Sequence, residues 1–139
     1  MDGKQAYKHF LKTWRKFQKI CEKNHIKAKD NFSCCNNCGH GDMHRLIEND
    51  NYEAYVFYCS QGKDIMIDNY KPEDNVMETY LQWSYIDNPE QCDDNLGNKI
   101  KQLAALSGAT AEYIDGKNAI KFTVNLPIKQ ENNNIEIII

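Results

Sequence analysis

The chain has 139 residues, of which 41% are hydrophobic and 27% charged, with a net charge of -3. This composition is typical of a soluble globular domain that buries its own core. No run approaches the roughly 20 apolar residues of a membrane-spanning helix, and no apolar signal region precedes the first charged residues. We therefore expect a single domain over residues 1–139, no membrane partner, and a cytoplasmic location in which thiols stay reduced.

Charge is distributed unevenly along the chain. Residues 1–29 carry nine basic and two acidic groups, a net +7, whereas the remainder carries 8 basic and 18 acidic groups, a net -10. A basic segment of this kind either lies against the acidic remainder or offers a face to a polyanion such as nucleic acid. The first interpretation is favoured, and the second is kept as an alternative.

The N-terminal segment has helical periodicity. Its apolar residues recur at steps of three and four, which predicts an amphipathic helix within residues 1–29, from Asp2 to about His25. Asp2 is suited to cap its N-terminus. The apolar residues are Tyr7, Phe10, Leu11, Trp14, Phe17 and Cys21. We expect this face to pack on a sheet, since aromatic residues at helical spacing are usually core.

The next part of the chain predicts mainly loops. Residues 26–30 read as a connection, and the Asn- and Gly-rich residues 36–41 read as turns, because both residue types tolerate a positive φ. A short helix is predicted over 42–48, with Asp42 as its cap. The aromatic run 52–58 predicts a strand that delivers Cys59 at its end.

The second half predicts a helix between strands. After a turn at 60–62 and a short strand or loop over 64–70, residues 76–86 predict a long strand with Met77, Thr79, Leu81, Trp83 and Tyr85 on one face. A helix capped by Asp94 or Asn95 is expected to run to Leu106 and stop at Gly108, with Ile100, Leu103, Ala104 and Ser107 on its apolar side.

A hairpin is predicted at the C-terminal end. Strands over 109–114 and 119–126 flank Asp115-Gly116, a strong hairpin signal. Residues 130–139 are an Asn-rich turn and a β-prone tail that is expected to pair with the sheet or with another subunit. The order of elements predicts an α+β fold: a mainly antiparallel sheet with helices on one face, the basic N-terminal helix, and a second helix before the C-terminal β-hairpin.

Chemistry is concentrated between Phe32 and His44. These thirteen residues hold three of the six cysteines and two of the four histidines. The element Cys35-x-x-Cys38-Gly39 resembles the metal knuckle of zinc ribbons and rubredoxin-like sites, which bind zinc through thiolates. A second C-x-x-C is missing, so the other ligands must come from elsewhere.

The remaining zinc ligands are predicted from a short set of residues. Cys59 and His44 are favoured as the third and fourth ligands, and His40 and Cys34 are alternates. Cys34 is expected in the core as a small hydrophobe, because adjacent cysteines do not easily face one ion. The predicted ligand set is Cys35, Cys38, Cys59 and His44.

A longer resemblance supports Cys59. The run from Asn31 to Gly39, containing Cys34-Cys35-x-x-Cys38-Gly39, followed by Tyr55-Val56-Phe57-Tyr58, a helix and a hairpin, resembles a family of small uncharacterised bacterial proteins. That family carries a C-C-x-x-C-G element and an aromatic strand that ends in His. The resemblance covers about residues 5 to 125 and implies that Cys59 takes the place of this His. It implies no activity.

Three functions follow as hypotheses. The first is a non-enzymatic binding module with structural zinc and an unknown protein partner, or a second copy bound through the C-terminal strand. The second is a thiol-disulfide oxidoreductase that uses Cys35 and Cys38; it is disfavoured because turn residues, and no β-α-β unit, surround the pair. The third is a polyanion-binding protein that uses the basic helix.

Overall fold

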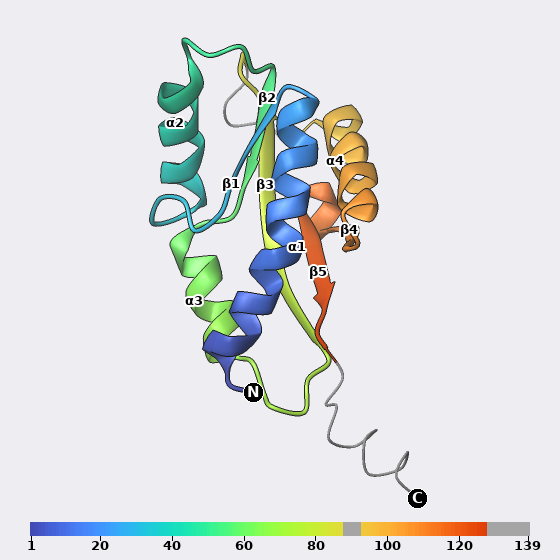
Figure 1. The fold of residues 1–139 in the computed structure, drawn as a ribbon. Helices are drawn as coiled ribbons and strands as arrows, with labels where there is room; N and C mark the ends of the chain where they lie inside the picture. The colour runs from blue at the N-terminus through green and yellow to red at the C-terminus, as the bar shows by residue number, and fades with distance from the viewer. Residues whose placement is uncertain (88–92, 128–139) are drawn as a thin grey trace, which may run out of the picture.

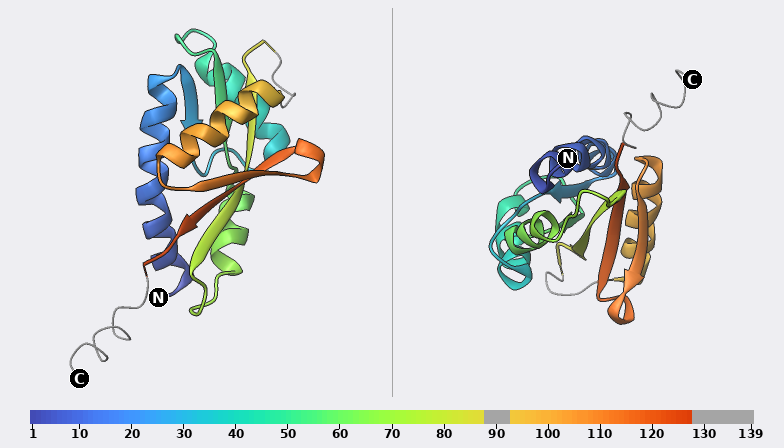
Figure 2. Two further views of the ribbon diagram at one scale, coloured as in Figure 1. Left: turned by 90° about the vertical axis from the view of Figure 1, so that its right-hand side faces the viewer. Right: turned by 90° about the horizontal axis from the view of Figure 1, so that it is seen from below.

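The fold is a five-stranded sheet with helices on both faces (Figures 1 and 2). The computed structural model describes residues 1–87 and 93–127. The elements, in chain order, are α1 (Gly3–Lys23), β1 (Ile26–Lys29), α2 (Asn36–Ile47), β2 (Ala54–Phe57), α3 (Ser60–Asp68), β3 (Val76–Tyr85), α4 (Asp94–Leu106), β4 (Thr110–Ile114), the 3-10 turn Asp115–Lys117 and β5 (Ala119–Asn125). Among the described helices, none is long and apolar enough to cross a bilayer.

The sheet is mainly antiparallel, as predicted. Its strand order is β1-β2-β3-β5-β4. Among the strands of the described residues, only β1 and β2 run parallel, and α2 forms the crossover between them. The hairpin of β4 and β5 turns at Gly116, whose φ of 65° lies in the left-handed region that favours glycine. The predicted α+β class and the hairpin are therefore confirmed.

Helix α1 covers one face through an aromatic core. Asp2 and Gln5 form a reciprocal capping box at its start. Phe10, Trp14 and Phe17 are fully buried and pack against Phe122, while Phe10 and Trp14 also meet the ring of Tyr58 edge-on. Together with the buried side of α4, these residues form what we call the large core. The predicted apolar face of the N-terminal helix is confirmed.

Helix α2 covers the opposite face, which corrects the prediction that all helices lie on one side. Met43 and Ile47 of α2 pack on Tyr55 and Phe57 of β2, forming a separate small core. The neighbouring β2 residues Ala54 and Val56 belong to the large core. Successive side chains of a strand point to opposite faces, so β2 separates the two cores.

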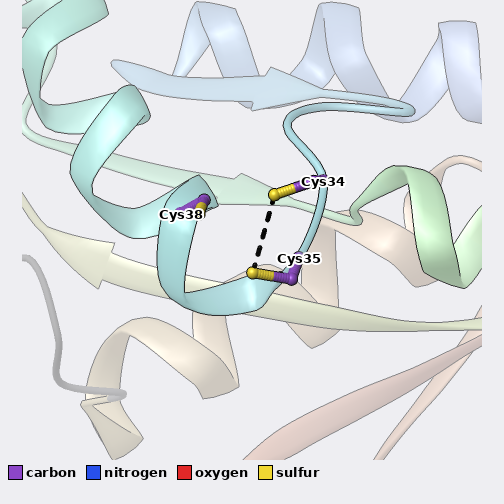
Figure 3. A group of neighbouring side chains, drawn as sticks. All are labelled: Cys34, Cys35 and Cys38. Atoms are coloured by element: carbon purple, nitrogen blue, oxygen red, sulfur yellow. Dashed lines mark hydrogen bonds between the residues drawn. The ribbon is translucent and has the colours of Figure 1, made fainter.

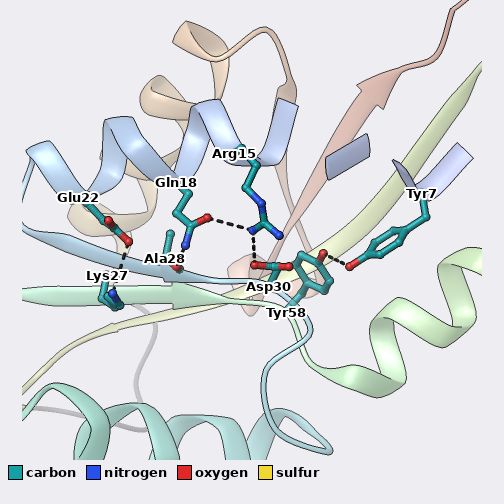
Figure 4. A network of polar contacts seen from close by, with 8 residues as sticks. All are labelled: Tyr7, Arg15, Gln18, Glu22, Lys27, Ala28, Asp30 and Tyr58. Atoms are coloured by element: carbon teal, nitrogen blue, oxygen red, sulfur yellow. Dashed lines mark hydrogen bonds and ion pairs between the residues drawn. The ribbon is translucent and has the colours of Figure 1, made fainter. Parts of the chain in front are cut away.

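Polar contacts fasten α1 to the edge strand (Figure 4). Arg15 pairs with Asp30 at 2.6 Å, and the Gln18 side chain donates to the Ala28 carbonyl at 3.0 Å. The hydroxyls of Tyr7 and Tyr58 share a hydrogen bond of 2.7 Å. Among the described residues, Arg15–Asp30 is the one ion pair that joins residues 1–29 to the rest of the chain, so both interpretations of the basic segment stay predictions.

Two predicted loops are regular elements. Residues 26–29 form β1, because pairing with β2 satisfies the hydrogen-bonding groups of its backbone. The sequence of this short Lys-containing segment gives no sign of that pairing. The predicted turn at 60–62 and the predicted strand or loop at 64–70 are wrong, because α3 begins at Ser60. The Ser60 and Gln61 amides reach the carbonyls of Ser33 and Cys34 at 2.9 and 3.4 Å. A tertiary contact thus satisfies amides at the start of this helix.

The long strand and the second helix agree closely with prediction. Met77, Thr79, Leu81 and Trp83 are buried, whereas Tyr85 is exposed. Helix α4 is capped by Asp93, one residue before the predicted caps, because the Asp93 carboxylate accepts from the Leu96 amide. Cys92 and the predicted tail over 130–139 lie outside the described residues.

Candidate metal centre

The C-x-x-C element forms the start of helix α2. Cys35 is the N-cap, with φ -149° and ψ 174°, and Cys38 is the third helical residue. The Gly39 amide donates to the Cys35 carbonyl at 2.9 Å, which closes the first turn. The turns predicted over 36–41 are therefore wrong. The consequence is chemical, since one helical turn brings both thiols to the positive end of a helix dipole.

Cys34 joins these two thiols, against the prediction that it is buried. It is exposed, and its Sγ lies 3.8 Å from that of Cys35 (Figure 3). Ser33 precedes it with a φ of 66°, in the left-handed region that non-glycine residues rarely adopt. The chain turns at Ser33 immediately before the adjacent pair. The sulfurs of Cys34, Cys35 and Cys38 all lie within 4.8 Å of one another, and we call them the cysteine cluster.

The pKa values of Cys35 and Cys38 are shifted in opposite directions. The approach of the Cys38 backbone amide, helped by the thiols of Cys38 and Cys34, lowers the pKa of Cys35. The neighbouring thiols of Cys34 and Cys35 raise the pKa of Cys38 to about 11. Cys35 is consequently the first thiol to ionise of this pair. A thiolate there is the form that binds metal or attacks a disulfide.

Asp42 holds the loop against the helix. Its carboxylate accepts from the Ser33 hydroxyl at 2.6 Å and contacts the Arg45 guanidinium. The Ser33 hydrogen bond, more than the nearby Arg45, keeps the pKa of Asp42 below its usual range. The hydrogen bond between Ser33 and Asp42 therefore joins the loop before the cysteine cluster to helix α2. The sequence prediction had assigned Asp42 only as a helix cap.

The favoured third and fourth ligands lie outside the cysteine cluster. Cys59 is 7% exposed and forms the N-cap of α3. The contacts of Ser60 and Gln61 with Ser33 and Cys34 keep its backbone beside the cluster. His44 is half-buried, and its Nδ1 has no hydrogen-bond partner in the described part of the chain. Their role as ligands stays a prediction.

His40, an alternate ligand, is engaged beneath α2. Its Nδ1 lies 2.6 Å from the Tyr55 hydroxyl, and its Nε2 lies 3.0 Å from Oε1 of Gln82. The Gln82 amide nitrogen donates to the Asn118 carbonyl at 3.0 Å, which leaves Oε1 to accept. Nε2 of His40 therefore donates to Gln82, and Nδ1 shares a hydrogen bond with the Tyr55 hydroxyl. Both nitrogens serve to anchor the helix.

Gly39 also anchors α2, for a steric reason. A Cβ at this position would lie 2.2 Å from the buried ring of Phe57. Only glycine lets the first turn approach β2 this closely. From the sequence, Gly39 was predicted to be part of a metal knuckle and His40 to be an alternate zinc ligand. The helical spacing of Gly39, Met43 and Ile47 was the available signal that this stretch lies on a sheet.

Together these features define an α+β domain with three clustered thiols at the start of a helix that is docked on the sheet. The family model described as a domain of unknown function, DUF6891, matches residues 15–125, so the chain belongs to this family. The predicted membership of an uncharacterised family agrees with this finding. Comparisons with curated proteins and with solved structures gave no match.

Proposed function

We propose that the chain is a non-enzymatic binding module in which the cysteine cluster binds zinc as a structural ion. The observation that supports this most directly is the 3.8 Å separation of the Cys34 and Cys35 sulfurs. Tetrahedral zinc with Zn–S bonds of about 2.3 Å separates its sulfur ligands by about 3.8 Å. The third sulfur, that of Cys38, lies within 4.8 Å of both, so a small movement brings it to the same ion.

The surroundings suit a thiolate-bound cation. The start of a helix favours negative charge, and the lowered pKa of Cys35 favours the thiolate that zinc requires. Bound zinc would fasten the loop after β1 to the first turn of α2. Three thiolates leave one tetrahedral position, for which we keep the predicted ligands Cys59 and His44.

Metal analysis of the full chain, purified without chelator, tests the proposal. We expect about one zinc per chain and a melting temperature that falls when a chelator removes it. Cys38→Ser should weaken zinc binding at least tenfold, since one of three thiolates is lost. Finding no metal, with the cluster thiols all reacting freely in the folded protein, would refute the proposal.

Cobalt substitution then counts the thiolates. The intensity of sulfur-to-cobalt charge transfer rises with each thiolate ligand, so three and four are distinguishable. A drop in Cys59→Ser identifies Cys59 as the fourth ligand. An unchanged charge-transfer band in Cys59→Ser, with altered d–d bands in His44→Ala, identifies the imidazole instead. No change in either variant leaves the fourth position to a ligand from solution.

A second function, thiol-disulfide exchange, is favoured by the position of Cys35 and Cys38 at the start of α2. The sequence prediction disfavoured this function because it placed turns there and found no β-α-β unit. Both reasons were wrong, since α2 connects the parallel strands β1 and β2. A Cys35 thiolate would attack a substrate disulfide and expel one thiolate. Cys38 would then attack the Cys35 sulfur and release the second thiol, which leaves a Cys35–Cys38 disulfide and transfers two electrons to the substrate.

Turnover of a small disulfide with glutathione as reductant tests this second function. Loss of turnover in both Cys35→Ser and Cys38→Ser, with Cys34→Ser still active, is the expected pattern. Equal turnover in Cys38→Ser and the unaltered chain would exclude this route, because no resolving thiol would then be needed.

A further inference from the structure

Helix α1 presents a basic face to solvent on the outside of the sheet (Figures 1 and 2). An α-helix turns about 100° per residue, which places Phe10, Trp14 and Phe17 in one buried stripe. By the same geometry, seven exposed basic residues fall within an arc of about 120° directly opposite that stripe. They are Arg15 and the six lysines that we call the lysine face: Lys4, Lys8, Lys12, Lys16, Lys19 and Lys23.

The charge of the lysine face is not neutralised within the described ranges, 1–87 and 93–127. None of its six lysines forms an ion pair with another described residue. Arg15 is paired with Asp30, and Glu22, at the margin of the arc, is paired with Lys27 (Figure 4). The acidic remainder of the chain therefore leaves this positive charge available to an anionic partner.

The lysine face also lowers the stability of the helix that carries it. Like charges four residues apart on a helix repel each other, and the lysine face contains four such pairs. The pairs are Lys4–Lys8, Lys8–Lys12, Lys12–Lys16 and Lys19–Lys23. Lys4 in addition lies in the first turn, where the helix dipole disfavours positive charge. A pattern that costs stability and packs against nothing in the fold indicates a role in binding.

The aromatic residues of α1 limit which polyanion fits. A helix that binds a lipid surface inserts its apolar side, but Phe10, Trp14 and Phe17 are fully buried in the large core. Single-stranded nucleic acid is bound by stacking bases on aromatic rings. Tyr7 of α1 is half-buried, and its hydroxyl is bonded to Tyr58. The surface of α1 therefore offers charge without insertion or stacking, which suits the phosphates of a double helix.

We propose that the lysine face binds duplex DNA through its phosphate groups, without reading the base sequence. Lysine binds phosphate as a point charge, whereas arginine is the residue that most often reads a base pair. Arg15 is held by Asp30, so the lysines carry the contact. The site lies on the opposite face of the sheet from α2 and the cysteine cluster, and it does not depend on bound metal.

The dimensions of α1 favour DNA over double-stranded RNA. Its 21 residues span about 30 Å, close to one turn of B-DNA. The major groove of B-DNA is about 12 Å wide and admits an α-helix, whereas that of A-form RNA is too narrow. Along a B-DNA groove, lysines at the two margins of the arc would reach the phosphates of both strands.

The probe for this site is a fluorescently labelled DNA duplex of about 20 base pairs, titrated with the full chain. We expect its anisotropy to rise, and the logarithm of the affinity to fall against the logarithm of the salt concentration with a slope of about -4, the value for four or five phosphate contacts. A duplex of unrelated sequence should bind equally. An RNA duplex of the same length and the single DNA strand should each bind at least tenfold more weakly.

Matched double variants locate the binding. Lys8→Gln with Lys12→Gln should weaken DNA binding at least tenfold at about 50 mM salt, and should bring the salt slope about 2 closer to zero, because two phosphate contacts are lost. Lys71→Gln with Lys117→Gln changes the net charge equally at exposed positions outside α1 and should leave binding unchanged. Without DNA, the α1 variant should melt no lower than the unaltered chain, because like-charge pairs are removed.

Several results would overturn the proposal. Undetectable or salt-insensitive binding at about 50 mM salt would show that the lysine face is only a solvated surface. Equal losses in the two double variants would show an effect of net charge alone. Tighter binding of the RNA duplex, or of vesicles containing phosphatidylserine, would assign the lysine face to another partner. Displacement of the DNA by polyglutamate at equal charge concentration would point to an acidic protein.

Discussion

The two faces of the sheet are built differently. The large core is a stack of buried aromatic rings with little polar content. The small core beneath α2 has four buried apolar residues and the polar chain His40–Tyr55 and His40–Gln82. Apolar area stabilises in proportion to its extent, whereas a buried hydrogen-bond network is sensitive to each of its members. The large core therefore sets global stability, and the small core sets the position of α2 and its thiols.

The largest effect is expected from Trp14→Ala. Trp14 is fully buried against Tyr58 and Phe122, and its truncation should cost about 3–5 kcal/mol of unfolding free energy. Denaturant unfolding measures this loss. Zinc affinity of the folded protein should stay unchanged. A loss below about 1 kcal/mol would show that the large core does not dominate stability.

Alkaline pH should also act on the large core. Burial raises the pKa of Cys21 above its ordinary 9.0 and that of Tyr58 above its ordinary 10.0, the latter helped by the Tyr7 hydrogen bond. The unfolded chain then loses these protons first, so unfolding free energy falls as pH rises above about 9, by up to ~1.4 kcal/mol per pH unit for each group. Denaturant unfolding between pH 8 and 11 measures the slope.

A control isolates one group in that pH dependence. Cys21→Ala removes the earlier of the two ionisations, so the decline in its unfolding free energy should begin nearer pH 10. Below pH 8 the variant should differ from the unaltered chain by a constant amount. An identical pH profile in both proteins would mean that Cys21 ionises equally easily when folded.

Gly39→Ala tests the small core. The new methyl group would overlap the buried ring of Phe57, and overpacking of this kind costs about 1–3 kcal/mol, more than the ~1 kcal/mol gained in helix propensity. Gly41→Ala is the matched control, because its nearest neighbour would be Arg45 at 3.6 Å. That variant should be stabilised. Zinc affinity should fall only in Gly39→Ala; equal behaviour of the two would refute close docking of α2.

Tyr55→Phe is expected to cost less than the changes above, about 1 kcal/mol. It removes the hydroxyl that shares a buried hydrogen bond with Nδ1 of His40. Tyr58→Phe is the comparison in the large core, where the remaining Tyr7 hydroxyl is only part-buried and can bond to water. Thermal unfolding of both variants should show the greater loss for Tyr55→Phe. The reverse order would mean that the His40 network contributes little.

Sequence periodicity predicted the elements of the large core well. In α1 and β3 the apolar spacing and the buried face coincide, so pattern and tertiary structure agree. The hairpin followed from Asp115-Gly116. These elements bury one apolar face each, and a periodic pattern encodes that directly.

The elements around the thiols were predicted poorly for identifiable reasons. The Asn and Gly residues that favour turns lie in α2 because Gly39 must pass close to Phe57. Because Cys34 and Cys35 are adjacent in the sequence, their side chains were predicted to point in different directions. Their sulfurs nevertheless lie 3.8 Å apart, directly after the left-handed backbone of Ser33. Both features arise from contacts between distant segments, which local propensity does not contain.

Helix α3 is held at both ends by other parts of the chain. Its first amides bond to the carbonyls of Ser33 and Cys34, and near its last turn a Cβ at Gly3 of α1 would lie 2.4 Å from the Ile67 carbonyl. The cysteine cluster and the start of α1 are therefore connected through one helix of nine residues. If the cluster binds zinc, the ion would stabilise α3 as well as the loop, and amide hydrogen exchange in α3 would slow.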